Sequence, residues 1–445
     1  MTKAFIGAAG TGKTHQLIQE TLRCAQAHDW IEGQRILGLT FMHGSRGRMD
    51  ERFGQLRGMG FRTSAETIDS FSLDLVRRFR RSIRLNGLVQ VDPDAGNDWS
   101  GSTDLHLASF ETIRRSAIEI LGLASVQTTL RSTYPLIVVD EIQDCTDGLF
   151  EIVQLLSKCS HVICAGDEFQ NLNRESSVSP VMKWLMHEHE VVELTVSKRT
   201  TVVPLLDAAL RLRNGTRNGL TIPIVSVPSF ALCAWEIASR VAYQGWRGSI
   251  ALLSPVSLAR SAFVRQTVER LEKEIGKTKK IGPYPVRWEE TQDVRRLEAL
   301  QQAWSPFEAI GQCTPAELRF QAMTHEALEL RSLYGTIRRQ LVLGGKSAIT
   351  QAQFNRMASR TLQGNHRWRG LDNIPGRRGM SIHSAKNREF DRVVILWPYE
   401  ASGDDLFRRR LLYNAVTRAK HDVVVIVQDG KGDRISKDSV LSLLA

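Results

Sequence analysis

The sequence predicts an α/β protein with parallel β-sheets that carry helices on both faces. Apolar runs typical of buried strands alternate along the chain with stretches of helical periodicity. The 445 residues are 42% hydrophobic and 24% charged, an ordinary globular composition with enough chain for about three domains of roughly 150 residues. This composition excludes wholesale disorder, and no apolar run approaches the roughly 18–20 residues that cross a bilayer.

The expected strands fall into two sets, one in the N-terminal half and one that begins near Gly248 and resumes after Gly379. The strands are expected at residues 4–7, 36–41, 136–140, 161–165, 249–254, 392–397 and 422–428. Two charged, largely helical segments interrupt these sets and are expected to be short insertions. The expected organisation is a first core over 1–200 with insertion 84–130, and a second core over 201–261 and 377–445 with insertion 262–376.

The net charge and the cysteine content indicate the kind of binding partner and the cellular compartment. Lys and Arg number 59 against 48 Asp and Glu, and the net charge of +11 favours a polyanionic partner, nucleic acid above all, although many basic enzymes bind no DNA. The six cysteines form no CxxC pair, which argues against zinc or iron–sulfur ligation and indicates a reducing compartment. Ala4-Phe5-Ile6 runs directly into glycines and leaves no room for a signal peptide, so we expect a cytoplasmic protein with no membrane partner.

A glycine-rich segment after the first expected strand fits GxxxxGK[ST], the phosphate-binding loop. The expected nucleotide contacts are Gly7, Ala8, Ala9, Gly10, Thr11, Gly12, Lys13, Thr14 and His15. The glycines let backbone N–H groups converge on phosphate oxygens at a helix N-terminus. Lys13 supplies a positive charge for the β- and γ-phosphates, and Thr14 offers a hydroxyl to Mg²⁺. The segment therefore predicts ATP and Mg²⁺ as ligands, and the alternative is a glycine turn with a chance lysine.

A second motif is the apolar run of residues 136–139, which ends in carboxylates. Ligands of parallel α/β sheets bind at the carboxyl ends of the strands. We expect Asp140 to hold Mg²⁺, through water, and Glu141 to orient and deprotonate the attacking water. The alternative is a solvated acidic turn that follows a core strand.

Asp140-Glu141-Ile142-Gln143-Asp144 resembles the DExQD box of superfamily 1 helicases of the UvrD/Rep type. Other segments resemble further motifs of that family, in the family's order. They are Leu39-Thr40-Phe41-Met42-His43 (TFTN), Thr67-Ile68-Asp69-Ser70-Phe71 (TxHSF), Gly166-Asp167-Glu168-Phe169-Gln170 (GDxxQ), residues 194–199 (LxxNYR), His383-Ser384-Ala385-Lys386-Asn387-Arg388-Glu389-Phe390 (HSAKGLEF) and residues 412–420 (LxYVAxTRAK). They run from residue 39 to residue 420, and with the phosphate loop they span nearly the whole chain.

The resemblance implies two RecA-like parallel-sheet P-loop domains with short helical insertions and with ATP in the cleft between the domains. It implies that Gln170 contacts the γ-phosphate and that Arg199 and Arg418 are arginine fingers. A planar cation there would stabilise the charge that spreads over the γ-phosphoryl oxygens. Glu389 would contact the ribose. For Arg199 and Arg418 the alternative is a surface arginine with a carboxylate neighbour.

The resemblance also implies a path for single-stranded DNA, along which hydroxyls bind phosphates and an aromatic ring stacks on a base. The expected contacts are Thr40, Phe41, His43, Ser70, His383 and Ser384. Phe41 could equally be a core aromatic residue at a strand end, and the two histidines could be capping residues.

The sequence departs from the family on the nucleotide side. Only a few residues precede Gly7, so the short glutamine-bearing segment that reads adenine has no space. Lys198 replaces the tyrosine that stacks on the base, and His15 replaces an arginine. Triphosphate binding is therefore predicted, whereas selectivity for adenine is not.

The sequence also departs from the family on the DNA side. Residues 171–175 lack the aromatic side chains that often follow the GDxxQ glutamine, and Asn387 and Arg388 replace a glycine and a leucine. Basic stretches offer other contacts, above all the one in which Trp368 stands between two arginines, although such stretches can equally be solvated helix faces. The chain has small insertions and shows no constellation of nuclease residues. In both respects it resembles the helicase-like subunits of Gabija-type anti-phage systems.

Two principal functions follow from these observations. The first is a DNA-dependent ATPase of the UvrD-like helicase type that translocates on single-stranded DNA, 3′ to 5′ by resemblance, and unwinds duplex. The second is an ATP-gated, DNA-sensing regulatory subunit of a nuclease complex, which binds single-stranded or partly duplex DNA without processive unwinding. A third alternative is an ATPase that responds to RNA.

Overall fold

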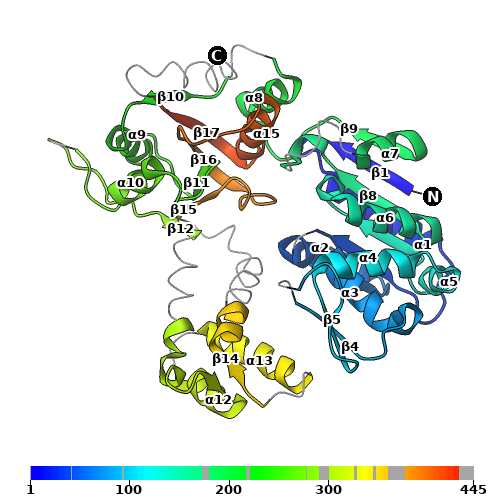
Figure 1. Cartoon of the computed structure of the whole chain (residues 1–445). Helices are drawn as coiled ribbons and strands as arrows, with labels where there is room; N and C mark the ends of the chain where they lie inside the picture. The colour runs from blue at the N-terminus through cyan, green and yellow to red at the C-terminus, as the bar shows by residue number, and fades with distance from the viewer. Residues whose placement is uncertain are drawn as a thin grey trace. The chain divides into compact units, whose positions relative to one another are not determined.

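The computed structural model describes residues 2–41, 43–92, 95–172, 180–216, 221–276, 278–289, 300–324, 328–343, 347–358 and 376–429. The chain divides into two compact units, Met1–Thr201 and Val202–Ala445. Each unit contains a six-stranded sheet in which every strand pair is parallel (Figure 1). The predicted α/β class is therefore confirmed, and the two sheets are consistent with two RecA-like domains.

The first sheet has the strand order β3-β2-β7-β8-β1-β9. Its strands are β1 (Thr2–Gly7), β2 (Ile36–Thr40), β3 (Thr63–Thr67), β7 (Leu136–Val139), β8 (His161–Gly166) and β9 (Glu190–Leu194). Because all six run in the same direction, their C-terminal ends lie along one edge of the sheet and their N-terminal ends along the other. We call these the carboxyl edge and the amino edge of the first sheet.

Helices cover both faces of the first sheet. One core includes side chains of α1 (Lys13–Ala27) and α2 (His43–Gly58), and the other includes side chains of α3 (Ile68–Phe79), α4 (Phe110–Leu121), α6 (Asp147–Cys159) and α7 (Pro180–Glu188). Alternate residues of a strand point to opposite faces. Thus Leu136 and Val138 pack beneath α1 and α2, whereas Ile137 and Val139 pack beneath the other four helices.

The segment 84–130 is not purely helical. It begins with a small sheet in the order β4-β6-β5 and continues into two helices. These elements are β4 (Leu88–Val91), β5 (Ser100–Gly101), β6 (Leu105–Ala108), α4 and α5 (Ala124–Thr133). Polar residues and glycines dominate the stretch between β4 and β6, so the sequence shows no apolar alternation there.

Helix α4 is joined firmly to the first core. Ile113 and Ile120 share a core with Val139 of β7. The Arg114 guanidinium donates from Nε to Asp69 Oδ1 over 2.7 Å and from Nη2 to Asp69 Oδ2 over 3.1 Å. This two-point ion pair fixes the orientation of α4 against α3.

The second sheet has the strand order β10-β17-β16-β11-β15-β12. Its strands are β10 (Ile224–Val227), β11 (Ser249–Ser254), β12 (Arg287–Trp288), β15 (Gly376–Ser381), β16 (Phe390–Trp397) and β17 (Ala419–Gln428). Helices α9 (Phe230–Tyr243) and α10 (Ala262–Leu271) share a core with Leu252, Val394 and Ile426 of this sheet. Helix α10 lies within the predicted insertion 262–376 by residue number, but its side chains belong to the core of the sheet.

Helices α8 (Val203–Asn214) and α15 (Asp405–Val416) are tied by one side chain. The Arg409 guanidinium donates from Nε to the Leu212 carbonyl over 2.8 Å and from Nη2 to the Arg213 carbonyl over 2.7 Å. The last carbonyls of a helix have no intrahelical partner and carry partial negative charge. Arg409 therefore caps α8 from α15.

Residues 300–358 have an apolar core of their own. Trp304, Leu318, Ile337 and Phe354 are buried together in it. The elements of this segment are η4 (Ser305–Phe307), β13 (Gln312–Cys313), α12 (Pro315–Thr324), α13 (Leu328–Leu343) and β14 (Ile349–Thr350). The segment is thus mainly helical, with one short antiparallel strand pair.

All seven strands expected from apolar runs are present, with ends within three residues of those expected. The strands that were not expected are β3, β9, β10, β12 and β15 in the two large sheets. Four of them lie at sheet edges, where one side of the strand has no neighbour and polar residues are tolerated. The fifth, β15, reads Gly-Arg-Arg-Gly-Met-Ser and has no apolar pattern.

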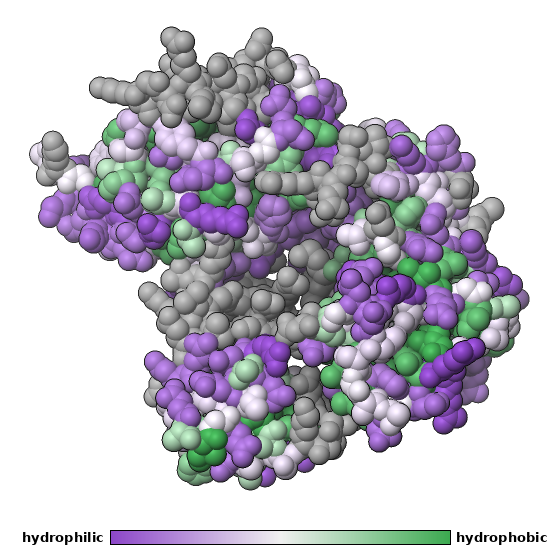
Figure 2. Space-filling view, viewed as in Figure 1, coloured by the Kyte–Doolittle hydropathy of each residue, from purple (hydrophilic) through white to green (hydrophobic). Residues whose placement is uncertain are grey.

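Hydrophilic side chains cover most of the described surface that Figure 2 shows. Within the described ranges, no helix combines the length and the apolar character needed to span a membrane. The six cysteines, all of them described, are free thiols, and every one except Cys24 is buried.

We predict that Gly38→Ala destabilises the first unit. A Cβ at Gly38 would lie 2.7 Å from Cε2 of Phe53 and 2.9 Å from Cγ of Met49, both buried on α2. Overpacking of this kind costs about 1–3 kcal/mol. The measurement is the free energy of chemical unfolding.

The matched control is Gly47→Ala on α2, where a Cβ meets nothing within 4 Å. It should raise the free energy of unfolding by roughly 0.5–1 kcal/mol, because alanine is the better helix former. If Gly38→Ala stabilises the protein as Gly47→Ala does, the proposed close packing of α2 on β2 is wrong.

Candidate active site

The phosphate loop forms the turn between β1 and α1. Gly10 and Gly12 have φ angles of 81° and 85°, in the left-handed region that favours glycine. A Cβ at Gly7 would lie only 2.4 Å from the carbonyl oxygen of Leu194, at the end of β9. The three glycines of the motif are therefore required by backbone conformation at two positions and by close packing at the third.

The segment after β9 packs directly against this loop. The Lys198 N–H donates to the Gly10 carbonyl over 2.6 Å, and a Cβ at Gly10 would lie 2.7 Å from Cβ of Arg199. Inside the loop, the Thr11 hydroxyl donates to the Ala8 carbonyl over 2.9 Å. Residues 197–199 thus form one wall beside the loop, and Arg199 lies close enough that its charge lowers the pKa of Lys13.

Lys13 is buried, with 8% of its surface exposed. Its ammonium donates to the carbonyls of Gly7 and Ala8 over 2.9 and 3.0 Å. Burial lowers the pKa of Lys13, while the carboxylates of Asp167, Glu141 and Asp140 act in the opposite direction. The buried cation is therefore balanced by three acidic side chains from the ends of β7 and β8, and the neighbouring His15 is exposed.

Thr14 and Asp140 meet at the carboxyl edge. The Thr14 hydroxyl donates to Asp140 Oδ2 over 3.1 Å, and the Glu141 backbone N–H donates to Asp140 Oδ1 over 3.0 Å. Burial, and after it repulsion by Glu141, raises the pKa of Asp140 to about 6. A cation in contact with this carboxylate would reverse the shift.

The donor set suits Mg²⁺. This ion is held in phosphate-transferring proteins by one or two protein oxygens, with substrate phosphates and waters completing an octahedron. Thr14 and Asp140 supply such a pair, and the raised pKa of Asp140 marks a carboxylate that lacks compensating positive charge. Among the described residues no group of three or more His, Cys, Asp or Glu side chains could hold a metal by itself.

Glu141 adopts a left-handed backbone conformation with φ 57°, which is uncommon for a residue with a Cβ. Such conformations concentrate at functional sites. The Gln143 side chain, in η2 (Ile142–Asp144), donates from Nε2 to Glu141 Oε2 over 2.6 Å. The carboxylate of Glu141 is thereby held in one orientation.

Gln143 also connects the two acidic strand ends. Its Oε1 accepts from the Asp167 N–H over 3.0 Å, and its carbonyl accepts from Asn171 Nδ2 over 2.9 Å. Gln143, Asp167 and Asn171 are all buried, as is Gln170 in η3 (Glu168–Gln170). The motif analysis assigned no role to Gln143, Asp167 or Asn171, although all three stand within or beside the motifs it identified.

The candidate DNA contacts of the first unit lie at the ends of β2 and β3. Thr40 pairs with Thr67 in the sheet, and the Thr67 hydroxyl accepts from the Ser70 N–H over 3.1 Å. Thr40 is fully buried, and partly buried Phe41 packs on the core beneath α3. His43 starts α2, but its side chain is outside the described part of the structure.

Arg418 lies in the second unit, at the end of α15. It is buried, with 2% of its surface exposed. Its guanidinium donates from Nε to the Asn414 carbonyl over 2.9 Å and from Nη1 to the Arg388 carbonyl over 3.4 Å. These bonds hold the side chain between α15 and the segment that precedes β16.

The turn between β15 and β16 carries the other candidates of the second unit. The hydroxyls of Ser381 and Ser384 lie 2.9 Å apart, and the Ser384 N–H donates to Ser381 Oγ over 3.1 Å. His383 and Ser384 are exposed. Glu389 forms an ion pair of 3.8 Å with Lys420, and Trp368 lies outside the described residues.

Comparisons with known families agree with this geometry. Residues 378–426 match the UvrD-like helicase C-terminal domain, and residues 2–175 match an AAA domain. The two matches relate the second of these segments to AAA domains and the first to the C-terminal domain of UvrD-like helicases. The first covers the β15–β17 region with Arg418, and the second covers the phosphate loop and the acidic strand ends. No curated protein matches the chain at a significant level.

Similar solved structures include the Arterivirus nonstructural protein 10 helicase (13% identity, TM-score 0.34), the same helicase in complex with DNA (11%, 0.33) and the PRRSV helicase (12%, 0.34). The alignments cover 98%, 99% and 96% of this chain and 61%, 63% and 52% of those chains. The chain thus spans about half to two thirds of the length of these helicases.

We predict that Asp140→Asn stabilises the nucleotide-free protein at pH 8. The native pKa of about 6 lies above the ordinary value of 3.8, so the native state holds this proton more tightly than the unfolded chain does. Stability is therefore lost as the pH rises between these two values, by up to about 3 kcal/mol. Removing the charge should restore roughly 1–3 kcal/mol, measured as the free energy of unfolding without Mg²⁺.

The same substitution should give a much smaller gain at pH 4, because there the native carboxyl is still protonated and the unfolded one is only partly ionised. Asp98→Asn, at an exposed carboxylate, is the control and should change stability little at either pH. An equal gain at pH 4 and pH 8 would show that the ionisation of Asp140 does not destabilise the protein.

Proposed function

We propose that this protein is an ATP hydrolase of the UvrD-like helicase type that translocates on single-stranded DNA, 3′ to 5′, and unwinds duplex. The observation that carries the proposal is the cluster at the carboxyl edge of the first sheet. There buried Lys13 faces the carboxylates of Asp140, Glu141 and Asp167. A buried lysine in a glycine-rich loop, beside a hydroxyl–carboxylate pair, is the arrangement that binds a triphosphate with Mg²⁺.

Each residue of this cluster has a separate role in ATP hydrolysis. Lys13 exchanges its bonds to the loop carbonyls for the β- and γ-phosphate oxygens. Thr14 and Asp140 would hold Mg²⁺, which would neutralise charge on those oxygens. Glu141, oriented by Gln143, accepts a proton from the attacking water. Gln170 senses the γ-phosphate next to the water-activating group.

Arg199 and Arg418 are proposed as the arginine fingers. Arg199 is supported by its position beside the phosphate loop. Arg418 is supported by the match of its segment to the UvrD-like C-terminal domain and by the bonds that hold its guanidinium. Each would stabilise the charge of the transferring phosphoryl group. A finger on the second core would make hydrolysis depend on domain closure and so couple it to movement along DNA.

The proposed DNA path uses Thr40, Phe41, His43 and Ser70 on the first core and His383 and Ser384 on the second. The exposure of His383 and Ser384 and the net charge of +11 support it. Burial of Thr40 limits that residue to an indirect role, because its hydroxyl faces the Glu66 carbonyl at 3.5 Å.

One observation favours a second candidate, an ATP-gated DNA-sensing subunit that signals to a separate nuclease, as in Gabija-type defence. Asn171 stands where the family often carries aromatic side chains that stack on bases. It is buried and donates to the Gln143 carbonyl, so it stabilises the catalytic loop and presents no ring to DNA. Weaker contacts with the bases would favour ATP-gated sensing of DNA over translocation along it.

We predict that Lys13→Ala and Glu141→Gln each lower the ATP hydrolysis rate at least 100-fold, because general-base catalysis alone contributes about 10²–10⁴-fold. The measurement is phosphate release with and without single-stranded DNA, repeated with RNA and with other nucleoside triphosphates. Lys183→Ala and Glu151→Gln, at exposed positions on α7 and α6, are the matched controls. Turnover near that of the unsubstituted protein in Lys13→Ala or Glu141→Gln would refute the site.

A strand-displacement assay separates the two candidate functions. The purified chain should displace the shorter strand of a duplex with a 3′ single-stranded tail, and Glu141→Gln should not. DNA-stimulated hydrolysis without displacement would instead support the sensing subunit. Stimulation by RNA but not by DNA would contradict both.

A further inference from the structure

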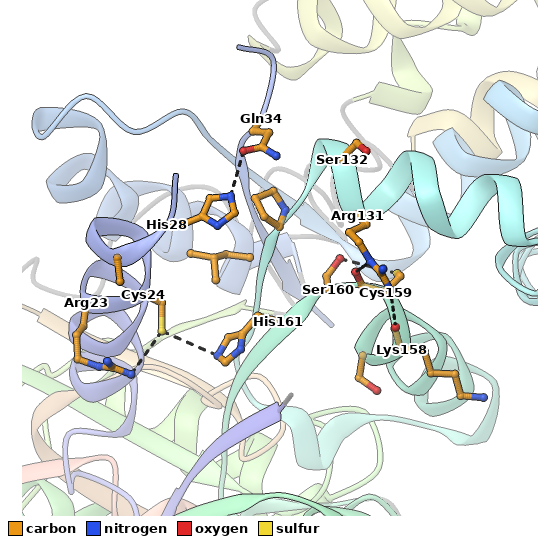
Figure 3. A pocket seen from close by; sticks show the side chains of 14 residues that line it. Arg23, Cys24, His28, Gln34, Arg131, Ser132, Lys158, Cys159, Ser160 and His161 are labelled. Atoms are coloured by element: carbon orange, nitrogen blue, oxygen red, sulfur yellow. Dashed lines mark hydrogen bonds between the residues drawn. The ribbon is translucent and has the colours of Figure 1, made fainter. Parts of the chain in front are cut away.

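A second site lies at the amino edge of the first sheet. A cavity of about 610 Å³ opens there between the C-terminal ends of α1, α5 and α6 and the beginnings of β7 and β8 (Figure 3). Leu136 and His161, the first residues of β7 and β8, line it. The phosphate loop and the acidic strand ends lie at the opposite edge, so the cavity shares no residue with the candidate active site.

One side of the cavity is cationic. Arg131 of α5 and Lys158 of α6 line it, and none of the lining residues is acidic. The Arg131 guanidinium is held in place because Nε donates to the Cys159 carbonyl over 3.0 Å and Nη2 to the Lys158 carbonyl over 3.4 Å. Within the described part of the chain the Lys158 ammonium has no ion pair or hydrogen bond, but Figure 3 shows its side chain extending away from Arg131 and the histidines, so it must turn to meet a ligand in the cavity.

The other side carries rings and amide groups (Figure 3). Nε2 of His28 lies 3.1 Å from Oε1 of Gln34, and Nε2 of His161 lies 3.9 Å from the Cys24 sulfur. Burial lowers the pKa of His161, which keeps its imidazole neutral at pH 7. Pro135 and Leu136 add apolar surface. Arg23 also lines this side, but its guanidinium is paired with Glu20 over 2.6 Å, so this side suits a planar, hydrogen-bonding ring.

Three helix C-termini would by themselves repel an anion, because their free carbonyls carry partial negative charge. Here several of these carbonyls have partners. Arg131 donates to the carbonyls of Cys159 and Lys158 at the end of α6. Trp30 Nε1 donates to the Ala25 carbonyl of α1 over 2.6 Å, and the Arg35 N–H donates to the Thr133 carbonyl of α5 over 3.0 Å. The cations that line the cavity are Arg131, Lys158 and Arg23, and of these Arg23 is already paired with Glu20.

We propose that this cavity binds a phosphate-bearing ligand of mononucleotide size, with its phosphate against Arg131 and Lys158 and its ring beside His28 and His161. The volume falls in the range of about 300–1,000 Å³ that small-molecule sites occupy and far exceeds the size of one phosphate ion. The proposal does not depend on ATP hydrolysis, because no lining residue takes part in it.

Cys24 provides a local reporter for this site. It lines the cavity, and it is the one cysteine of the six that is not buried. Iodoacetamide should therefore alkylate Cys24 first, and the rate can be followed by mass spectrometry of its peptide. We expect AMP at millimolar concentration to slow this alkylation several-fold, both in the unsubstituted protein and in Lys13→Ala, whose phosphate loop is disabled.

Charge variants test the assignment. Lys158→Gln and Lys158→Glu should weaken the protection by AMP about tenfold or more, with only a small fall in the thermal unfolding midpoint, because the ammonium has no hydrogen bond or ion pair and loses only its attraction to the C-terminal end of α6. Lys183→Glu, an exposed lysine on α7 away from the cavity, is the matched control and should leave protection unchanged.

Inorganic phosphate separates the two parts of the proposal. It should protect Cys24 less than AMP does at equal concentration. Equal protection by phosphate would overturn the role of the ring side. Absence of protection by AMP, or full protection in Lys158→Glu, would overturn the site, and neither outcome bears on whether the protein hydrolyses ATP.

Discussion

Burial of one positive charge among three negative ones organises the first unit. Lys13 has little access to water, and the carboxylates of Asp140, Glu141 and Asp167 oppose the shift that burial alone imposes on its pKa. Burial, and after it repulsion by Glu141, raises the pKa of Asp140. Burying these four charges without a ligand costs free energy in the folded protein. A bound triphosphate with its metal ion would reduce the repulsion among the carboxylates and would give the Lys13 ammonium a direct partner.

The parallel topology makes this cluster possible. Because β1, β7, β8 and β9 run in the same direction, the phosphate loop, the two acidic turns and the Ser197–Arg199 wall all emerge at one edge. Gln143 then joins the acidic turns through Glu141 and Asp167, so that the Glu141 carboxylate and the end of β8 are part of one hydrogen-bond network. A network of this kind couples the positions of the two strand ends.

The two edges of the sheet have opposite electrostatic character. Carboxylates gather at the carboxyl edge, whereas the cavity at the amino edge is lined by cations and by no acid. Helix α1 connects the two, since it begins at the phosphate loop and its last residues line the cavity. Strands β7 and β8 do the same, so a ligand at the amino edge would contact three elements that end in the active site.

Local sequence determined much of this protein. The seven strands with apolar runs, the phosphate loop and the acidic turn after β7 are visible in the chain because burial of both sheet faces demands apolar residues and phosphate binding demands glycines and a lysine. The polar edge strands, β15 and the small sheet before α4 show no such apolar pattern. An edge strand has a neighbour on only one side, and a very short strand buries few side chains, so neither requires an apolar sequence. The roles of Gln143, Asp167 and Asn171, and the whole of the amino-edge cavity, were decided by tertiary structure. Gln143 is joined to Asp167 and Asn171, which lie 24 and 28 residues away in the chain, and only the folding of the sheet brings these groups within hydrogen-bond distance.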